Sequence, residues 1–563
     1  GLERIRELVE QGLTYDEAKE AVRAGTVFTT HTPVPAGIDR FPQALVERYF
    51  GGDNAVAAVP VDRILELGVE EDPAVFNMAH MGLRLAQRRN GVAKLHRVVS
   101  RQMFASLWPG FDAAEVPISS VTNGVHAPTW VSREVFELAE REIGPSITTD
   151  ATGWEGIAKV PAASIWHTRR VLRARLVDEV RRRLRASWLQ RGASGAELAW
   201  TDTAFDPDVL TIGFARRVPS YKRLTLMLRD EGRLRDLLLH PTQPVQLVIA
   251  GKAHPADDGG KELVQQIVRF ADAEDVRHRI AFLPDYDIGM ARYLYGGCDV
   301  WLNNPLRPLE ACGTSGMKSA LNGGLNLSIR DGWWDEMFDG ENGWAIPTAD
   351  GVSDPSRRDD LEASAFYELV EKQVRTRFYD TDSEGIPSRW VDMVRHTLQT
   401  LGPKVLASRM VRDYVHELYT PAARSSRSLA ADSYAPAREL AAWLAVVATR
   451  WPGVRVAHVE ALGVGDAPEV GGRMTVRATV DLAGLRPDDV TVQAAYGRVD
   501  EVDELRSPSC VTLKDAGTGD DGLIRFEGDV PLERAGSFGY TVRVLPHHAA
   551  LPADTDLGLV ASA

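Results

Sequence analysis

The stretch CDVWLNNPLRPLEACGTSGMKSALNGGLNLSIRD, residues 298–331, contains the pattern on which the fold prediction rests. Its two ends, 298–304 and 325–331, are short and mainly apolar, as buried strands of parallel sheets are. Between them, small residues at 313–316 precede Lys318 and an apolar, helix-forming segment. We therefore predict a strand, a loop that closes onto a helix, and a second strand.

The alternation of strand and helix continues upstream of this stretch. Apolar strands are expected at 208–215, 245–251 and 279–284, and helices at 259–273 and 288–297. Such alternation predicts a parallel sheet with helices on both faces, which is a Rossmann-like lobe of the α/β class. In such a lobe, ligands bind at the carboxyl ends of the strands.

Polar residues follow three of these strands at that edge. They are Arg216, Arg217, Tyr221 and Lys222 after the first strand, Tyr286 after the third, and Glu310 after the fourth. The segment 215–223, ARRVPSYKR, is either a clamp for an anion such as phosphate or a solvated run of charge. The helix start before Lys318 is likewise either an anion site or a glycine-rich turn with an ordinary surface lysine. A Walker P-loop is disfavoured because Met317 separates Gly316 from Lys318.

Upstream of residue 208 the pattern is mixed. A β-branched strand ends at His31, which is either a ligand residue at the strand mouth or a structural histidine. A long helical tract is expected from about 74 to 107. Asn123 begins an Asn-Gly turn after a short strand, and Asn-Gly by itself favours a hairpin turn. The arginine-rich helix at 164–191 is expected to present a solvated face.

Downstream, the segment 331–344 combines aromatic residues with carboxylates, as either a packed loop or a sugar-stacking loop. The Ser/Ala/Arg stretch at 422–436 predicts a linker or long loop. Strand-like alternation beyond 451 predicts a β-sandwich of unknown role. The expected domains are a first lobe at 1–205, the Rossmann-like lobe with closing helices at 206–425, a linker and helix at 426–450, and the sandwich at 451–563.

Composition limits the possible functions. The 563 residues carry a net charge of −14, which argues against binding nucleic acid through its phosphates. Three widely spaced cysteines indicate no disulfide framework and no zinc or other metal site, and they suit a reducing cytoplasm. No run approaches the length of a membrane span. The first residue is Gly rather than Met, so we expect a fragment of a longer chain.

Six motifs, in order and with matching spacing over about 20–420, resemble the α-glucan (glycogen/maltodextrin) phosphorylases. The family's signature around its cofactor lysine, Glu-Ala-Ser-Gly-Thr-Gly-Asn-Met-Lys, stands here as EACGTSGMK at 310–318. The six motifs around this signature are TTHTP, NMAH with NGVAKLH, SVTNGVHAPTW, FARRVPSYKR, FLPDYDIGMA and LNLSIRDG. The form of the lysine motif is similar to the bacterial branch. The resemblance implies a two-lobed, glycosyltransferase-B-type fold that lacks the family's N-terminal part.

The resemblance also implies pyridoxal 5′-phosphate, bound as a Schiff base on Lys318. The implied cofactor neighbours are Thr314, Ser315 and Arg216 at its phosphate, with Trp130 and Tyr286 beside it. The implied catalytic residues are Arg217 and Lys222, which hold the substrate phosphate, and His31 in the sugar site. The implied substrate-binding residues are Asn123, Glu310, Cys312, Gly313 and Tyr221. Three positions depart from the family pattern: Cys312 replaces a serine, Asp287 an arginine and Pro219 a histidine.

The activity implied is phosphorolysis of glycogen or maltodextrin at non-reducing ends. Inorganic phosphate would yield α-D-glucose 1-phosphate with retention, and the cofactor phosphate would take part in proton transfer, since a phosphate monoester titrates near pH 6. We expect a homo-oligomer that binds α-1,4-glucan and phosphate. Two alternatives stay open: a nucleotide-sugar-dependent glucan synthase of the same fold, and an inactive glucan-binding or assembly subunit.

Overall fold

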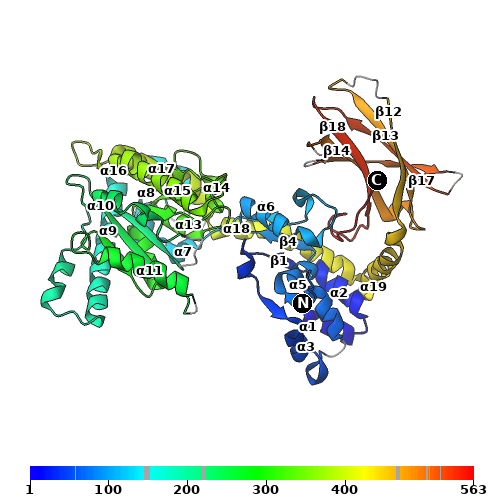
Figure 1. Cartoon of the computed structure of the whole chain (residues 1–563), viewed down its shortest axis with the longest axis horizontal. Coiled ribbons are helices and arrows are strands. Elements are labelled where there is room, and N and C mark those ends of the chain that lie inside the picture. The colour runs from blue at the N-terminus through cyan, green and yellow to red at the C-terminus, as the bar shows by residue number, and fades with distance from the viewer. Residues whose placement is uncertain are drawn as a thin grey trace. The chain divides into compact units, whose positions relative to one another are not determined.

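A computed structural model describes the chain apart from residues 57–58, 145–152, 218–222, 256, 464–468, 502–504, 506–507 and 520–521, and apart from the side chains of Ala36 and Arg217. The described residues form two compact units. The first consists of Gly1–Gly91, Arg97–Ser120 and Val415–Ala563, and the second of Val92–His96 and Val121–Tyr414. Figure 1 labels many of the elements of both units. Among the described residues, no helix combines the length and the hydropathy needed to cross a membrane.

The second unit is built on a six-stranded sheet with the order β11-β10-β9-β6-β7-β8, in which every pairing is parallel. Its strands are β6 (Leu210–Arg217), β7 (Val245–Lys252), β8 (Ile280–Leu283), β9 (Val300–Asn303), β10 (Leu325–Ile329) and β11 (Gly343–Ile346). The strands contribute side chains to two hydrophobic cores, one on each face of the sheet. Ile212 and Leu247 lie in one core, and Ala215 and Val248 lie in the other. This arrangement confirms the predicted parallel sheet with both faces covered.

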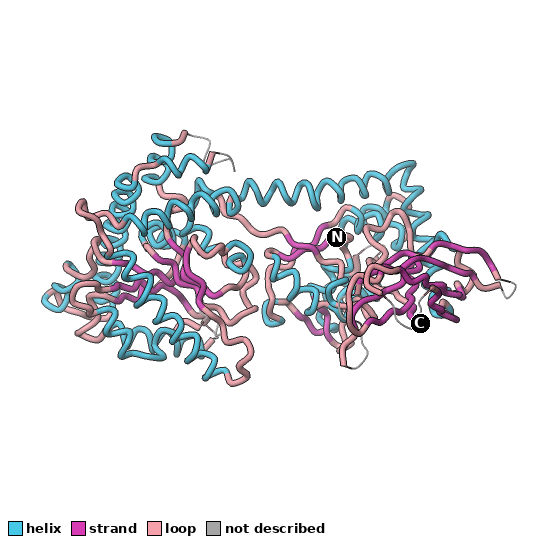
Figure 2. Tube along the Cα trace, turned by 90° about the horizontal axis from the view of Figure 1, so that it is seen from above, coloured by secondary structure: helices cyan, strands magenta, loops and turns pink. Residues whose placement is uncertain are grey.

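Helices surround this sheet, as the tube in Figure 2 shows. They are α7 (Ala127–Trp130), α8 (Arg133–Glu142), α9 (Ala162–Gln190), α10 (Glu231–Leu238), α11 (Asp258–Ala271), α12 (Ile288–Gly297), α13 (Thr314–Ala320), α14 (Trp333–Met337), α15 (Pro355–Leu369), α16 (Arg375–Tyr379), α17 (Ser388–Val405) and α18 (Ala407–Tyr414). Helix α9 packs on α12 and β8 and so belongs to this unit. The domain boundaries expected from the sequence stay a prediction.

The expectation that the arginine-rich helix α9 presents only a solvated face is wrong for two of its arginines. Arg169 and Arg173 are buried, and Nη1 of Arg173 lies 2.5 Å from Oδ1 of Asp299. Arg169 donates hydrogen bonds to the backbone oxygens of Cys298 at 2.6 Å and Asn322 at 2.8 Å. Buried guanidinium groups are tolerated here because a buried carboxylate and helix-end carbonyl oxygens accept hydrogen bonds from them.

The first unit begins with helices and a small parallel sheet of order β1-β4-β5. Its strands are β1 (Val27–Thr29), β4 (Arg88–Gly91) and β5 (Ser119–Ser120), with an antiparallel pair β2 (Arg40–Pro42) and β3 (Val75–Asn77). The helices are α1 (Leu2–Glu10), α2 (Tyr15–Ala24), α3 (Gln43–Phe50), α4 (Val61–Gly68) and α5 (Met78–Arg84), and α6 (Lys94–Met103) begins in the other unit.

The single helix expected from 74 to 107 is wrong. The tract contains β3, α5, β4 and α6 in succession. Asn77 starts α5 as an N-cap, since its Oδ1 accepts the backbone N–H of Ala79 at 2.9 Å. Asn90 then pairs in register with Thr29 across the parallel sheet. The helical spacing of apolar residues could not reveal that long-range pairing, which fixes β4 as a strand.

The C-terminal part of the first unit is a helix followed by two antiparallel sheets. Helix α19 (Thr420–Arg450) covers most of the expected linker and leaves helical geometry only at Ala431–Tyr434. The sheets have the orders β12-β13-β17-β16 and β15-β14-β18-β19 and share one core. Their strands are β12 (Arg455–Leu462), β13 (Arg473–Asp481), β14 (Val490–Arg498), β15 (Ser509–Thr512), β16 (Lys514–Thr518), β17 (Ile524–Pro531), β18 (Phe538–Pro546) and β19 (Ala561–Ser562). The predicted sandwich strands are confirmed, and the predicted linker is largely helix.

Candidate active site

The lysine singled out in the sequence lies on α13, at the carboxyl edge of the parallel sheet. Gly313 precedes the helix with a φ of +83°, a conformation that favours glycine. A Cβ at this position would lie 2.8 Å from Oε1 of Glu310, so a side chain there would also displace that carboxylate. The glycine therefore allows Glu310 and the start of α13 to lie close together.

The Lys318 amine lies against an aromatic wall. Its Nζ is 3.9 Å from the ring centroid of Trp130 and 5.3 Å from that of Tyr295. Burial lowers the pKa of Lys318 to about 8, because the charged form loses hydration there. With such a pKa, about one tenth of the lysine side chains are neutral at pH 7. The neutral amine is the form that reacts with carbonyl groups.

Further aromatic side chains fix this wall in place. The Tyr295 ring packs on Trp130 at 5.5 Å and on Trp301 at 4.7 Å between centroids. The hydroxyls of Tyr286 and Tyr295 are 2.8 Å apart, and Nε1 of Trp301 donates to Oγ of Ser315 at 3.1 Å. Predicted residues Trp130, Tyr286, Ser315 and Lys318 are thus brought together through two aromatic residues that the sequence did not single out.

Asn322 joins the lysine helix to the helix that carries Trp130, and its role was missed in the sequence. Its Oδ1 accepts the Ser132 backbone N–H at 2.7 Å. Its Nδ2 donates to the backbone oxygens of Trp130 at 2.9 Å and Lys318 at 2.8 Å. Only its place in the Leu-Asn-Gly that follows the lysine motif signalled this residue. Its amide holds the Trp130 ring and Lys318 in one arrangement.

A carboxylate and a guanidinium meet beside this wall. Arg216, at the end of β6, lies 3.4 Å from Glu310 and also donates to Oδ1 of Asn303. The Glu310 backbone N–H donates to Oδ2 of Asp331 at 3.0 Å, and the Gly332 N–H donates to Oδ1 at 2.8 Å. Burial raises the pKa of Asp331 to about 7. Asp331, also missed in the sequence, fixes the loop that carries Glu310.

Cys312, on the loop that carries Glu310, lies beside Asn123, which is on a second loop of this unit, between β5 and α7. Burial raises the pKa of the Cys312 thiol above its ordinary value, and the Asn123 backbone N–H offsets only part of that rise. The Asn123 carbonyl accepts from Arg409 at 2.9 Å, and β5 before it runs parallel to β4. Gly124 is required because a Cβ there would lie 2.4 Å from the Leu406 carbonyl oxygen. The loop is therefore not a simple hairpin turn.

For the remaining predicted residues, the structure gives no contact with the Lys318 wall, or the residue lies outside the described part of the chain. Thr314 is the first residue of α13, and Arg217 ends β6, with only its backbone described. Tyr221 and Lys222, with Pro219, lie outside the described residues. His31 is exposed in the loop after β1, in the first unit. Asp287 caps α12, since its Oδ1 accepts the Met290 N–H at 2.7 Å.

The loop at 331–344 is a packed loop rather than a sugar-stacking surface. Trp333, Trp334 and Trp344 are all buried. Glu336 accepts the Thr122 hydroxyl at 2.7 Å and the Lys94 backbone N–H at 3.2 Å. The aromatic side chains of this loop therefore pack in the core of the unit and do not present a surface to a sugar. Among the described residues, no group of three or more His, Cys, Asp and Glu is arranged to hold a metal ion.

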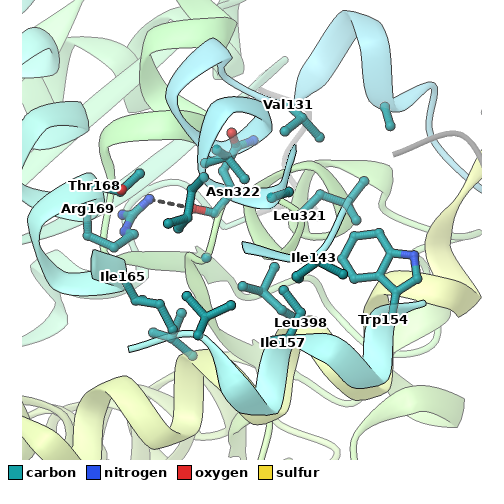
Figure 3. Close-up of a pocket in the computed structure, with 17 residues that line it drawn as sticks. Val131, Ile143, Trp154, Ile157, Ile165, Thr168, Arg169, Leu321, Asn322 and Leu398 are labelled. Atoms are coloured by element: carbon teal, nitrogen blue, oxygen red, sulfur yellow. Dashed lines mark hydrogen bonds between the residues drawn. The ribbon is translucent and has the colours of Figure 1, made fainter. Parts of the chain in front are cut away.

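A small apolar cavity of about 40 Å³ adjoins the helices that carry Lys318 and Trp130, and Figure 3 shows it. Leu321 and Asn322 line it, as do Val131, Trp154 and Leu398. The dashed line in Figure 3 marks the Arg169 hydrogen bond to the Asn322 backbone oxygen. Its lining is almost wholly apolar, so it is a packing void beside the site rather than a substrate pocket.

These features define the class: a parallel α/β lobe with an aromatic-walled, partly neutral lysine beside a paired glutamate at the sheet's carboxyl edge. The family model for carbohydrate phosphorylase matches residues 2–340, and that for the glycogen phosphorylase C-terminal domain matches residues 451–563. The chain therefore belongs to the carbohydrate phosphorylase family.

Several curated proteins are similar to this chain in sequence. Glycogen phosphorylase of Mycobacterium tuberculosis (strain ATCC 25618 / H37Rv) is 61% identical over 567 residues, covering 100% of this chain and 66% of that protein. Maltodextrin phosphorylase of Thermococcus litoralis is 36% identical, covering 99% of this chain and 65% of that protein. Glycogen phosphorylase of Aquifex aeolicus is 40% identical over 74% of this chain and 60% of that protein. The chain thus spans about two thirds or less of the length of these relatives.

Proposed function

We propose that the protein is an α-1,4-glucan phosphorylase. It would cleave glycogen or maltodextrin at non-reducing ends with inorganic phosphate and release α-D-glucose 1-phosphate with retention. Membership of the carbohydrate phosphorylase family supports the reaction class. The observation that carries the proposal is the Lys318 amine, which lies 3.9 Å from the Trp130 ring centroid with its pKa lowered to about 8.

The residues around Lys318 suit pyridoxal 5′-phosphate as the cofactor. A partly neutral amine can form a covalent bond with the cofactor's aldehyde, and the Trp130 and Tyr295 rings offer an apolar wall for its flat ring. Thr314, Ser315 and Arg216 would hold its phosphate. When bound, the cofactor supplies a phosphate group that exchanges protons near neutral pH.

Other side chains of this chain would act on the substrates. Arg217 and Lys222 would bind inorganic phosphate and offset the repulsion between two phosphate groups. Glu310 would accept hydrogen bonds from sugar hydroxyls, with Cys312, Gly313, Asn123 and Tyr221 as further sugar-binding residues of the second unit. His31, in the first unit, stays a predicted sugar-binding residue. The Asp331 carboxylate supports this role because it binds the Glu310 backbone N–H and so fixes that residue.

Two further properties belong to the same proposal. We place the protein in the cytoplasm as a homo-oligomer, acting on glucan rather than on nucleic acid or a membrane. All three cysteines are free, which is compatible with a reducing compartment. Size-exclusion chromatography with light scattering would measure the oligomeric state directly.

Borohydride trapping tests the cofactor assignment. The chain is incubated with pyridoxal 5′-phosphate, reduced with borohydride and digested, and the pyridoxyl group is located by peptide mass. We expect the group on Lys318, and we expect Lys318→Ala to lose both the label and glucose 1-phosphate formation. Lys261→Ala, at an exposed lysine paired with Asp258, is the matched control and should keep both. Label elsewhere, or phosphorolysis by Lys318→Ala, would refute the proposal.

A further inference from the structure

A second cavity, of about 510 Å³, lies within the first compact unit, and none of the residues assigned above line it. Its walls come from α2, α4, α5, β4, the segment 106–108, α19 and the segment 556–559. These segments are far apart in the sequence. A cavity of this size is in the usual range for small-molecule sites.

Buried ion pairs hold the walls of this cavity in place. The Asp556 side chain is fully buried and lies 2.9 Å from Arg23 and 2.7 Å from Arg89. Arg23 also binds Glu20 at 2.7 Å. Because these pairs join α2 and β4 to the C-terminal segment, the cavity is formed before any ligand binds.

The lining carries more positive than negative charge. Its charged residues are Lys19, Arg23, Arg63, Arg84 and Arg89 against Glu20, Glu66 and Asp556. The whole chain has a net charge of −14, so this local excess of cations is opposite in sign to the charge of the chain as a whole. A cavity with this balance favours an anion over a cation or a neutral molecule.

Arg84 is the cation in this lining that lacks a counter-ion. Its Nη1 donates to the backbone oxygens of Glu66, Leu67 and Val69 at 2.8 to 3.1 Å, around the end of α4. In the described part of the chain, no carboxylate forms an ion pair with it, and burial lowers its pKa. The carbonyls orient the guanidinium but carry only partial charge, so an anion in the cavity would complete its electrostatic environment.

Trp108 supplies an unsatisfied donor in the same lining. The residue is 4% exposed, and its Nε1 has no hydrogen-bond partner among the described residues. An indole N–H only donates, so it requires an acceptor. The opposite part of the lining is apolar and includes Leu444, Val447 and Leu557.

We infer that this cavity binds an organic anion with an apolar body, such as an aromatic sulfonate or carboxylate. The anionic group would face Arg84, which has no counter-ion among the described residues, and Trp108, whose Nε1 lacks an acceptor, and the apolar body would lie against the leucine and valine side chains. This site is separate from the proposed phosphorylase site and does not depend on the activity proposed above.

Calorimetric titration with two matched probes tests the inference. Naphthalene-2-sulfonate carries a charge, and naphthalene-2-sulfonamide has nearly the same shape without it. We expect one sulfonate site per chain and at least about tenfold weaker binding of the sulfonamide. Arg84→Gln should weaken sulfonate binding by about tenfold, and Trp108→Phe, which keeps an aromatic ring but removes Nε1, by about fivefold.

Two control variants make the same chemical changes outside the cavity. Arg101→Gln removes a guanidinium that donates only to the backbone oxygens of Ile118 and Ala114, and Trp200→Phe removes another buried indole N–H without a partner in the described structure. Both should bind the sulfonate within about twofold of the parent. Equal binding of the two probes, absence of saturable binding, or unchanged affinity in Trp108→Phe would overturn the inference. If Arg84→Gln does not fold, the probe comparison and Trp108→Phe still decide.

Discussion

The Lys318 amine is buried against an aromatic wall, and its lowered pKa gives a titration that can be measured. Burial lowers the pKa of Lys318 to about 8 in the folded chain, whereas an unfolded lysine titrates near 10.4. Between these values the unfolded chain binds more protons, so the free energy of unfolding of the cofactor-free chain should rise as pH increases from about 8 to 10.4. Lys318→Met should remove this part of the pH dependence.

Competitive acylation followed by peptide mass spectrometry measures the same titration directly. We expect the Lys318 labelling rate of the folded, cofactor-free chain to have a midpoint near pH 8. The same lysine in the urea-unfolded chain is the control and should show a midpoint near 10.4. A common midpoint for both states would show that the aromatic wall does not perturb the amine.

Asn322 gives a second prediction for a single residue. Asn322→Asp keeps the acceptor for the Ser132 N–H but points a carboxylate oxygen at the carbonyls of Trp130 and Lys318. We expect a loss of about 1–3 kcal/mol in the free energy of unfolding, measured by denaturant titration, together with altered tryptophan fluorescence. Asn54→Asp changes an exposed amide that donates to the Arg48 carbonyl, and it should cost less than about 0.5 kcal/mol. Equal losses in both variants would contradict this role.

Motif residues were predictable, and their backbone-binding neighbours were not. The sequence indicated Lys318 and Glu310 because small residues, a lysine and a carboxylate follow strands at the expected edge. Asn322 and Asp331 bind backbone groups of residues near in space. Any sequence can supply a backbone N–H or C=O, so no pattern of side chains marks these contacts. Only the tertiary structure shows which side-chain amide or carboxylate binds a given backbone group.

At the scale of elements, two valines one helical turn apart on α17 differ in whether they line the apolar cavity. Val394 lines the cavity, whereas Val391 is buried in closely packed core and does not. Val394→Ile adds one methylene where about 40 Å³ is empty, so it should stabilise the chain by up to about 1 kcal/mol. Val391→Ile, the matched control, should destabilise it by about 1–3 kcal/mol. Thermal unfolding of both variants measures the difference, and destabilisation by Val394→Ile would contradict the prediction.

The strands of the large sheet were predictable because their apolar runs are short and separated by amphipathic helices. The helix expected at 74–107 was wrong because Asn77 caps a new helix and Asn90 pairs across to Thr29. The solvated face expected of α9 was wrong for Arg173 because Asp299 lies in the core beside it. In each case a partner distant in the sequence outweighed a local pattern.

At the scale of the whole molecule, Asp556 links the two ends of the chain within one compact unit. Burial opposes its ionisation, but the charges of Arg89 and Arg23 outweigh that effect and hold the pKa of Asp556 below its ordinary value. The stability that Asp556 contributes is therefore present above about pH 4 and is lost as pH falls below it. The sequence alone could not predict this pairing, because more than half of the chain separates the partners.

Asp556→Asn tests this link, because it leaves two buried guanidinium groups without their shared carboxylate. We expect a loss of about 3–5 kcal/mol in the stability of the first compact unit at pH 7. Amide hydrogen exchange, read by peptide mass, should show faster exchange in α2, β4 and the segment 556–559, and the loss should shrink as pH falls below 4. Asp554→Asn breaks only a partly exposed pair with His547 and should change exchange little. If the two variants exchange alike, the buried ion pairs do not hold the C-terminal segment against the N-terminal helices.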